Sequence, residues 1–173
     1  VTYCSGFHWP QDRRQRLMDT SDSRREILVD QQLASTLDSV DAAEERAAAA
    51  ATQIGFHEEE TFRFGYAVRE ALVNAVVHGN RYSANKRVHF VVVREGSTLE
   101  VSISDEGEGF ELLRQTDPLA EENLLNQSGR GLTLIRAFVD EFRVGPAENG
   151  GTLAVLRKTL PSPDENFQEA EKH

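Results

Sequence analysis

Apolar and polar residues alternate in one part of the chain, and this spacing predicts a strand. Leu99, Val101 and Ile103 alternate with polar residues over 98–104, so one face of this strand is expected to be buried. The preceding apolar segment, 87–96, ends in Glu95–Gly96 and predicts a hairpin with the first strand. A short apolar segment at 25–33 predicts an earlier strand. Segment 141–160 predicts a second hairpin that turns at Asn149-Gly150-Gly151.

Three other segments have the spacing of helices. The alanine-rich segment 35–55 favours a helix that Ser39 or Asp41 could cap and that Gly55 ends. Segment 57–80 has an acidic first turn, which suits the positive end of a helix dipole, and Gly79-Asn80 can close it. The third helix is expected over 131–142, with its apolar face formed by Leu132, Ile135, Phe138, Val139 and Phe142.

The order of these elements is strand, two helices, hairpin, helix and hairpin. Because strands pair locally and do not alternate strictly with helices, the pattern predicts an α+β fold. It should be a two-layer sandwich with helices on one face of a mixed, mostly antiparallel sheet. One domain is expected at 24–160. Residues 1–23 are polar, contain Pro10 and predict a flexible N-terminal extension, and 161–173 predict an acidic flexible tail.

The helix around EALVNAVVHGN, residues 70–80, carries its polar residues in an unusual place. At about 100° per residue, Glu70, Asn74 and His78 share one narrow stripe, and apolar side chains cover nearly all the rest. A surface helix has a broad polar face, so this helix should be buried. Its stripe of carboxylate, amide and imidazole must then face something polar.

Two glycine-containing motifs follow this helix. In the first, Asp105 ends an apolar strand and precedes Gly107 and Gly109. The second is SGRGL, 128–132, which opens a helix. Glycines let the backbone approach a ligand closely, and a helix N-terminus binds phosphate through its free N–H groups. Each motif alone is weak evidence, because either could be an ordinary turn.

Composition excludes several classes of function. The chain of 173 residues has a net charge of −10, which disfavours binding to nucleic acid or to an anionic membrane. No apolar run approaches the ~20 residues of a membrane span, and the only cysteine, Cys4, cannot form an internal disulfide. A cytoplasmic protein is therefore expected. The sequence has no Walker motif, no zinc-ligand spacing and no evident Ser-His-Asp order.

Taken in order, the three motifs resemble those of the GHKL ATPases, which share the Bergerat ATP-binding fold, a histidine-kinase-like ATPase domain. Segment 70–80 resembles the N box, 105–109 the first glycine box and 129–131 the second. The size of the domain and the residues of the N box are most similar to the anti-sigma factor serine/threonine kinases. This resemblance covers residues 24–160 and implies ATP and Mg²⁺ as cofactors.

The polar stripe would then face Mg-ATP. Asn74 fits a single amide ligand to Mg²⁺, which takes its other oxygens from water and phosphate. Glu70 is placed to accept a proton from an attacking hydroxyl or water, with a buried salt bridge as the alternative. His78 would contact phosphate or water, or make a structural hydrogen bond.

The resemblance assigns the remaining site residues. Asp105 accepts a hydrogen bond from the adenine amino group, and Gly107 and Gly109 let a lid hinge. Thr152 matches an adenine-side threonine, although an ordinary strand threonine is an equal reading. The lid itself would be 109–127, expected to be mobile without nucleotide. The phosphates would be wrapped by Ser128, Gly129, Arg130 and Gly131. A solvated surface arginine is the alternative for Arg130.

The sequence therefore predicts an ATP-dependent serine/threonine protein kinase. By resemblance, its partners are an anti-anti-sigma factor, which it phosphorylates, and an RNA polymerase sigma factor, which it sequesters. A homodimer is compatible with the resemblance. Two alternatives stay open: a nucleotide-gated binding module without kinase activity, and a histidine kinase catalytic module. His57 is a poor phospho-acceptor for the latter, because it lies on the same helix as Glu70 and could not fold back to the ATP site.

Overall fold

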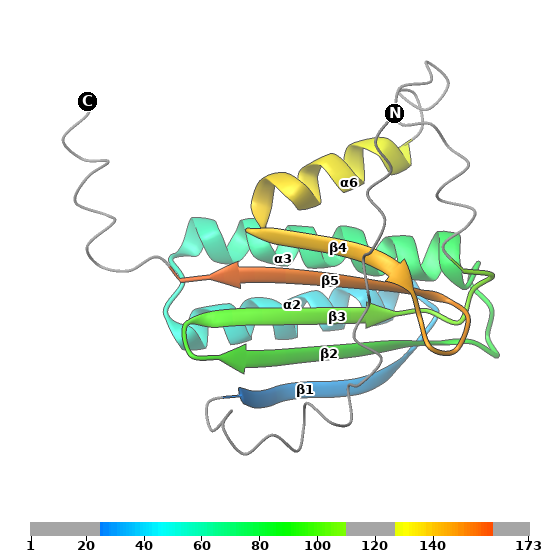
Figure 1. Ribbon diagram of the computed structural model, residues 1–173, viewed down its shortest axis with the longest axis horizontal. Coiled ribbons are helices and arrows are strands. Elements are labelled where there is room, and N and C mark those ends of the chain that lie inside the picture. Colours follow the sequence, from blue (N-terminus) through cyan, green and yellow to red (C-terminus); the bar gives the residue numbers. More distant parts are fainter. Residues whose placement is uncertain (1–24, 110–126, 161–173) are drawn as a thin grey trace, which may run out of the picture.

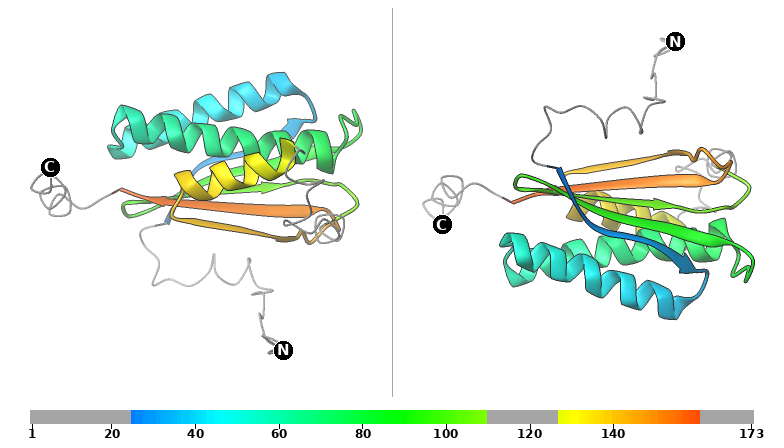
Figure 2. Two further views of the ribbon diagram at one scale, coloured as in Figure 1. Left: turned by 90° about the horizontal axis from the view of Figure 1, so that it is seen from above. Right: turned by 90° about the horizontal axis from the view of Figure 1, so that it is seen from below.

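Three helices pack on one face of a five-stranded sheet in the computed structural model, which describes residues 25–109 and 127–160 (Figure 1). The strand order is β1-β2-β3-β5-β4, and each of the four pairings is antiparallel. Figure 2 shows the sheet nearly edge-on, with the helices on the same side. The predicted α+β sandwich with a mostly antiparallel sheet is confirmed.

The strands lie where the apolar patterns predicted them. The β2–β3 hairpin turns at Gly96, whose φ of 61° lies in the left-handed region that favours glycine. The second hairpin turns at 147–151, where Ala147 N donates to Gly151 O at 2.8 Å. The strand bounds are β1 Arg25–Ala34, β2 Arg87–Glu95, β3 Thr98–Ser104, β4 Glu141–Pro146 and β5 Thr152–Thr159.

Helix α2, Leu37–Ile54, ends as the sequence predicted but begins differently. Gly55 closes it in the left-handed conformation with a φ of 107°. Its N-cap is Thr36, whose side chain accepts a hydrogen bond from Ser39 N at 3.3 Å. The prediction of Ser39 or Asp41 as the cap was therefore wrong. Because β1 runs to Ala34, the chain is already turning at Thr36, and the helix starts earlier than its composition suggested.

The second predicted helix consists of two parts. Helix α3, Glu58–Val73, is followed without interruption by a π-helix, η1, at Asn74–Gly79. The wider turn is closed by Asn80 N, which donates to Ala75 O at 2.8 Å. The expectation of a regular α-helix up to Gly79 was wrong for this last turn. The residue types alone do not distinguish the two kinds of helix.

The third helix, α6 at Gln127–Phe138, starts and ends earlier than predicted. Val139 lies just after it, and Phe142 belongs to β4, where it pairs with Leu156 of β5. Both positions are apolar because they face the core from a strand and a turn, and their helical spacing was coincidental. The predicted boundaries at residues 23 and 161, and the predicted lid between Gly109 and Gln127, lie at or beyond the limits of the described residues.

The hydrophobic core fills the space between the sheet and the helices. Its largest side chains have at most 1% of their surface exposed, and they come from both layers: Phe64, Leu72, Phe90, Ile103 and Ile135. This core holds α3 and η1 against the sheet. The end of η1 therefore lies beside the C-terminal end of β3 and the N-terminal end of β5. The N box and the two glycine boxes therefore come together at this end of the sheet, while the segment predicted to be the lid lies outside the described residues.

Two helical glycines differ sharply in the space around them. A Cβ atom at Gly65 would stand 3.7 Å from Ala48 Cβ, an ordinary contact, whereas at Gly79 it would stand 2.4 Å from Asp105 Cγ. Gly65→Ala is expected to raise the free energy of unfolding by about 0.5–1 kcal/mol, because alanine favours a helix. Gly79→Ala should lower it by about 1–3 kcal/mol through overpacking. Urea denaturation of both variants tests this, and equal effects would contradict the packing described.

Candidate functional site

The polar stripe of the N box is only partly covered. Glu70 on α3 and Asn74 at the start of η1 are half-buried, and His78 is exposed. Their apolar neighbours, such as Leu72 and Val76, are fully buried. The prediction that this helix is buried apart from one polar stripe is therefore confirmed, whereas what the stripe faces stays a prediction.

Asp105 lies directly after β3 and is only 4% exposed. Its Oδ1 accepts hydrogen bonds from Gly107 N at 2.8 Å and from Thr152 N at 3.1 Å. Its own backbone N–H donates to Thr152 O at 2.9 Å. Thr152 thus lies beside Asp105, and the end of β3 is tied to the start of β5 at the carboxylate.

Burial raises the pKa of Asp105, and the backbone amides of Gly107 and Thr152 oppose this shift. Among the residues whose side chains the structure describes, 25–109 and 131–160, Asp105 forms no ion pair. These amides and the positive charge of Lys86 favour the ionised carboxylate, but burial outweighs them. The protein therefore holds a carboxylate in an environment that disfavours its charge.

Glycines surround this carboxylate. A Cβ atom at Gly107 would stand 2.8 Å from Asp105 Oδ1, and one at Gly151 would stand 1.9 Å from Asp105 O. Together with Gly79, these residues bring three stretches of backbone against Asp105, closer than any other residue type permits. Gly109 has a φ of 95° and approaches Gly150, where a Cβ would stand 2.7 Å from Gly150 O. The hinge expected at Gly107 and Gly109 stays a prediction.

The N box also meets the second glycine box. A Cβ atom at Gly131 would stand 2.7 Å from Glu70 Oε2, so the carboxylate of α3 packs on the backbone of α6. Ser128, Gly129 and Arg130 belong to the first turn of α6. Among the residues whose side chains the structure describes, 25–109 and 131–160, Glu70 forms no salt bridge, and its role stays a prediction.

Three contacts at this site could not be found in the sequence. From the sequence, Gly79 and Asn80 are the last residues of the N box and close its helix, and Gly151 is part of a turn, without any predicted contact to Asp105 or Glu106. In the structure Gly79 and Gly151 are packed on Asp105, and the buried Asn80 side chain accepts a hydrogen bond from Glu106 N at 2.8 Å. The only signal in the sequence was that glycine and asparagine directly follow a polar helix stripe.

The arrangement fits a nucleotide better than a metal held by protein ligands alone. Among the described residues, no group of three or more His, Cys, Asp or Glu side chains could hold a metal ion. Asp105 instead offers a buried acceptor between glycines, which can receive a planar donor at close range. Asn74 offers one amide oxygen, enough for a Mg²⁺ ion that takes its other ligands from water and phosphate.

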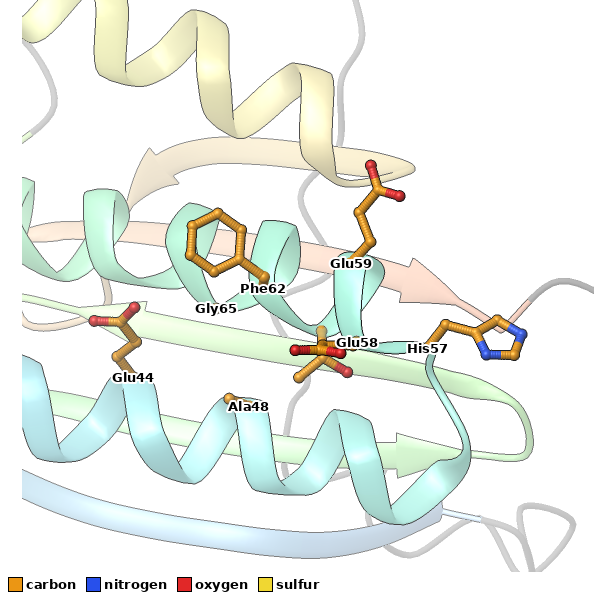
Figure 3. Close-up of a pocket in the computed structure, with 8 residues that line it drawn as sticks. Glu44, Ala48, His57, Glu58, Glu59, Phe62 and Gly65 are labelled. Atoms are coloured by element: carbon orange, nitrogen blue, oxygen red, sulfur yellow. The ribbon is translucent and has the colours of Figure 1, made fainter.

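A separate groove of about 850 Å³ lies between α2 and α3 (Figure 3). It is located at the beginning of α3 and includes none of the predicted site residues. Its lining is formed by Glu44, Ala48, His57, Glu58, Glu59, Thr61, Phe62 and Gly65. His57 is therefore at the opposite end of α3 from the polar stripe.

The helices in the described ranges include none with the length and hydropathy of a membrane span.

Asp105→Asn is expected to stabilise the fold at neutral pH, because it removes a buried charge and keeps an Oδ1 acceptor for both amides. The raised pKa of Asp105 means that its contribution to stability is full below the unfolded pKa near 3.8 and is lost as pH rises through the folded pKa. The advantage of the variant should therefore shrink towards pH 3. Urea denaturation at pH 7 and pH 3 measures this, and a variant that is less stable by about 1 kcal/mol at pH 7 would refute it.

Comparison with known proteins agrees with this geometry. Residues 33–158 match the family model described as the histidine kinase-like ATPase domain, a range that includes Glu70, Asp105 and Thr152. The Anti-sigma F factor of Anoxybacillus flavithermus is 35% identical over 95 residues, which cover 54% of this chain and 65% of that protein. The Anti-sigma F factor of Bacillus thuringiensis is 36% identical over 104 residues, which cover 59% of this chain and 71% of that protein. The chain thus spans about two thirds of the length of these relatives.

A solved structure supports the fold independently. The crystal structure of the RsbU and RsbW domains of Rv1364c from Mycobacterium tuberculosis superimposes with a TM-score of 0.52 at 21% identity. The match covers 78% of this chain and 33% of that chain. Because the family match extends over most of its length, this chain belongs to the family of histidine kinase-like ATPase domains.

Proposed function

We propose that this protein is an ATP-dependent serine/threonine protein kinase and anti-sigma factor. It would phosphorylate a small anti-anti-sigma protein and sequester an RNA polymerase sigma factor, and so regulate transcription. Membership in a family of ATPase domains implies that it binds ATP. The observation that carries the proposal is the buried carboxylate of Asp105, which lacks an ion pair among the described residues and lies between three glycines.

Asp105 would select adenine. Oδ1 already accepts two backbone amides, so Oδ2 is the oxygen that would accept from the adenine amino group. A fixed, charged acceptor strengthens this hydrogen bond. Thr152 is joined to Asp105 by two hydrogen bonds, since its N–H donates to Oδ1 and its carbonyl oxygen accepts from Asp105 N, and its side chain would complete the adenine side. Gly107 and Gly109 would let the backbone approach the nucleotide.

Asn74 would bind Mg²⁺, and His78 would contact phosphate or its water. Phosphate would also be bound by the first turn of α6, which contains Ser128, Gly129, Arg130 and Gly131. The free N–H groups of a helix N-terminus favour anions at this position. When bound, Mg-ATP supplies the transferable γ-phosphoryl group.

Glu70 would act as the general base. It is half-buried, lies one turn before Asn74 and packs on Gly131 of the second glycine box. Its carboxylate would hold the hydroxyl of the partner protein and take its proton as the oxygen attacks. A carboxylate already in a salt bridge would be a poor base, and Glu70 forms none with the residues whose side chains the structure describes, 25–109 and 131–160.

The partners are proposed from the relatives. Two of them carry the name Anti-sigma F factor, and that name applies to those proteins. We transfer it to this chain because the identity of 35% and 36% extends over 95 and 104 residues, which is more than half of this chain. A homodimer stays a prediction. The histidine kinase alternative is not favoured, because His57 lies at the far end of α3 from Glu70.

Phosphate transfer can be measured with ATP labelled on the γ-phosphate, Mg²⁺ and the anti-anti-sigma protein encoded by the same organism. An acid-stable label on that protein is expected. Glu70→Ala and Glu70→Gln should each lower the transfer rate by about 100-fold or more, because loss of a general base has effects of that size. Both variants should bind ATP nearly as well as the parent protein.

Glu59→Gln is a matched control, since Glu59 is exposed and lies at the other end of α3. Its transfer rate should not change. An acid-labile label would instead indicate phosphohistidine. Binding of ATP without any transfer would leave a nucleotide-gated binding module and would overturn the kinase assignment.

A further inference from the structure

A single buried amide joins four segments around the candidate nucleotide site. Asn80, which follows η1, is 1% exposed. Its Nδ2 donates to Ser35 Oγ and to Arg87 O, both at 2.9 Å. Its Oδ1 accepts from Glu106 N at 2.8 Å. The side chain thus connects the end of the N box to the β1–α2 connection, to the start of β2 and to the first glycine box.

The hydrogen bond to Glu106 has a special position. Glu106 N belongs to the peptide directly after Asp105, while Gly79, the residue directly before Asn80, packs against the Asp105 carboxylate. The end of η1 and the first glycine box are therefore joined by two adjacent contacts: Gly79 with Asp105, and Asn80 with Glu106. One fits the carboxylate against the backbone of η1, and the other fixes the peptide that carries it.

The backbone directly after Asn80 is strained. Arg81 and Tyr82 both have positive φ, 53° and 56°. Two consecutive residues of this kind, neither of them glycine, are held in a conformation that costs about 1–2 kcal/mol each. Tyr82 N donates to Val76 O at 3.0 Å, so the backbone folds back onto the π-helix. The turn at Arg81 and Tyr82 is therefore strained, and it holds Asn80 beside the first glycine box.

We propose that Asn80 is a positioning residue for nucleotide binding. It sets the distance between the N box, which carries Asn74, and the first glycine box, which carries Asp105. This inference rests on the proposed function, since it takes Asp105 as the acceptor for adenine. Asn80 touches no nucleotide in this scheme. It acts through the Glu106 peptide, and without it the Asp105 carboxylate would lose its fixed position relative to η1.

Ser35 provides a matched control from the same network. It is 3% exposed, accepts from Asn80 and donates to Lys86 O at 2.9 Å. Ser35→Ala removes buried hydrogen bonds, and so lowers stability, but leaves the bond between Asn80 and Glu106. Asn80→Ala removes the bond to Ser35 as well, together with the bonds to Arg87 O and from Glu106 N. If Asn80 only stabilised the fold, the two variants would affect nucleotide binding alike.

The test measures the dissociation constant for ADP with Mg²⁺ by calorimetry, at a temperature where urea denaturation shows each variant to be folded. Asn80→Ala is expected to weaken binding about tenfold or more, and Ser35→Ala less than about threefold. In an Asp105→Asn background, Asn80→Ala should cause less than about threefold further loss, because Asn80 acts through Asp105. If Asn80→Ala does not fold, Asn80→Ser, which leaves a smaller void, takes its place in all comparisons.

The outcomes separate this inference from the proposed function. Equal losses for Asn80→Ala and Ser35→Ala, or a full additional loss in the Asp105→Asn background, would overturn the positioning role and leave the kinase proposal intact. Binding of ADP by the parent protein without phosphate transfer would overturn the kinase alone. A parent protein that binds no adenine nucleotide would overturn both.

Discussion

The buried carboxylate of Asp105 is the constraint on which this end of the molecule depends. A charge that is 4% exposed needs donors, and Asp105 receives them from the amides of Gly107 and Thr152. To deliver these amides, the chain after β3 must turn back tightly and β5 must begin beside it. The backbone can come this close only where side chains are absent, which explains Gly79, Gly107 and Gly151.

Burying this carboxylate lowers the free energy of unfolding, and other parts of the fold must offset that loss. Burial raises the pKa of Asp105, so the ionised form is disfavoured in the fold. The stabilisation that offsets this comes from the apolar layer between sheet and helices, where side chains such as Phe64, Phe90 and Ile135 are fully buried. A hydrophobic core that contributes far more than this carboxylate costs allows the fold to keep Asp105 buried.

The π-helix has a comparable role. Because η1 is wider than an α-helix, its exit returns to the glycine box through Asn80 and the strained residues Arg81 and Tyr82. Irregular helical turns are frequently found at functional sites, where they change the direction of a side chain or of the chain. Here the irregular turn begins at Asn74, one turn after Glu70, and it ends with Gly79 against Asp105 of the first glycine box.

The sequence by itself determined the elements and the motifs, because the alternation in β3, the alanine run of α2 and the helical spacing of the N-box stripe are local signals. Only the tertiary structure decided how the motifs meet. Thr36 caps α2 because β1 ends just before it. Gly79 packs on Asp105, and Asn80 accepts from Glu106, because the core fixes α3 and η1 across the sheet. These contacts join residues far apart along the chain, and local pattern contains no information on such distances. The sequence therefore named the groups of the site but not the bonds that hold them in place.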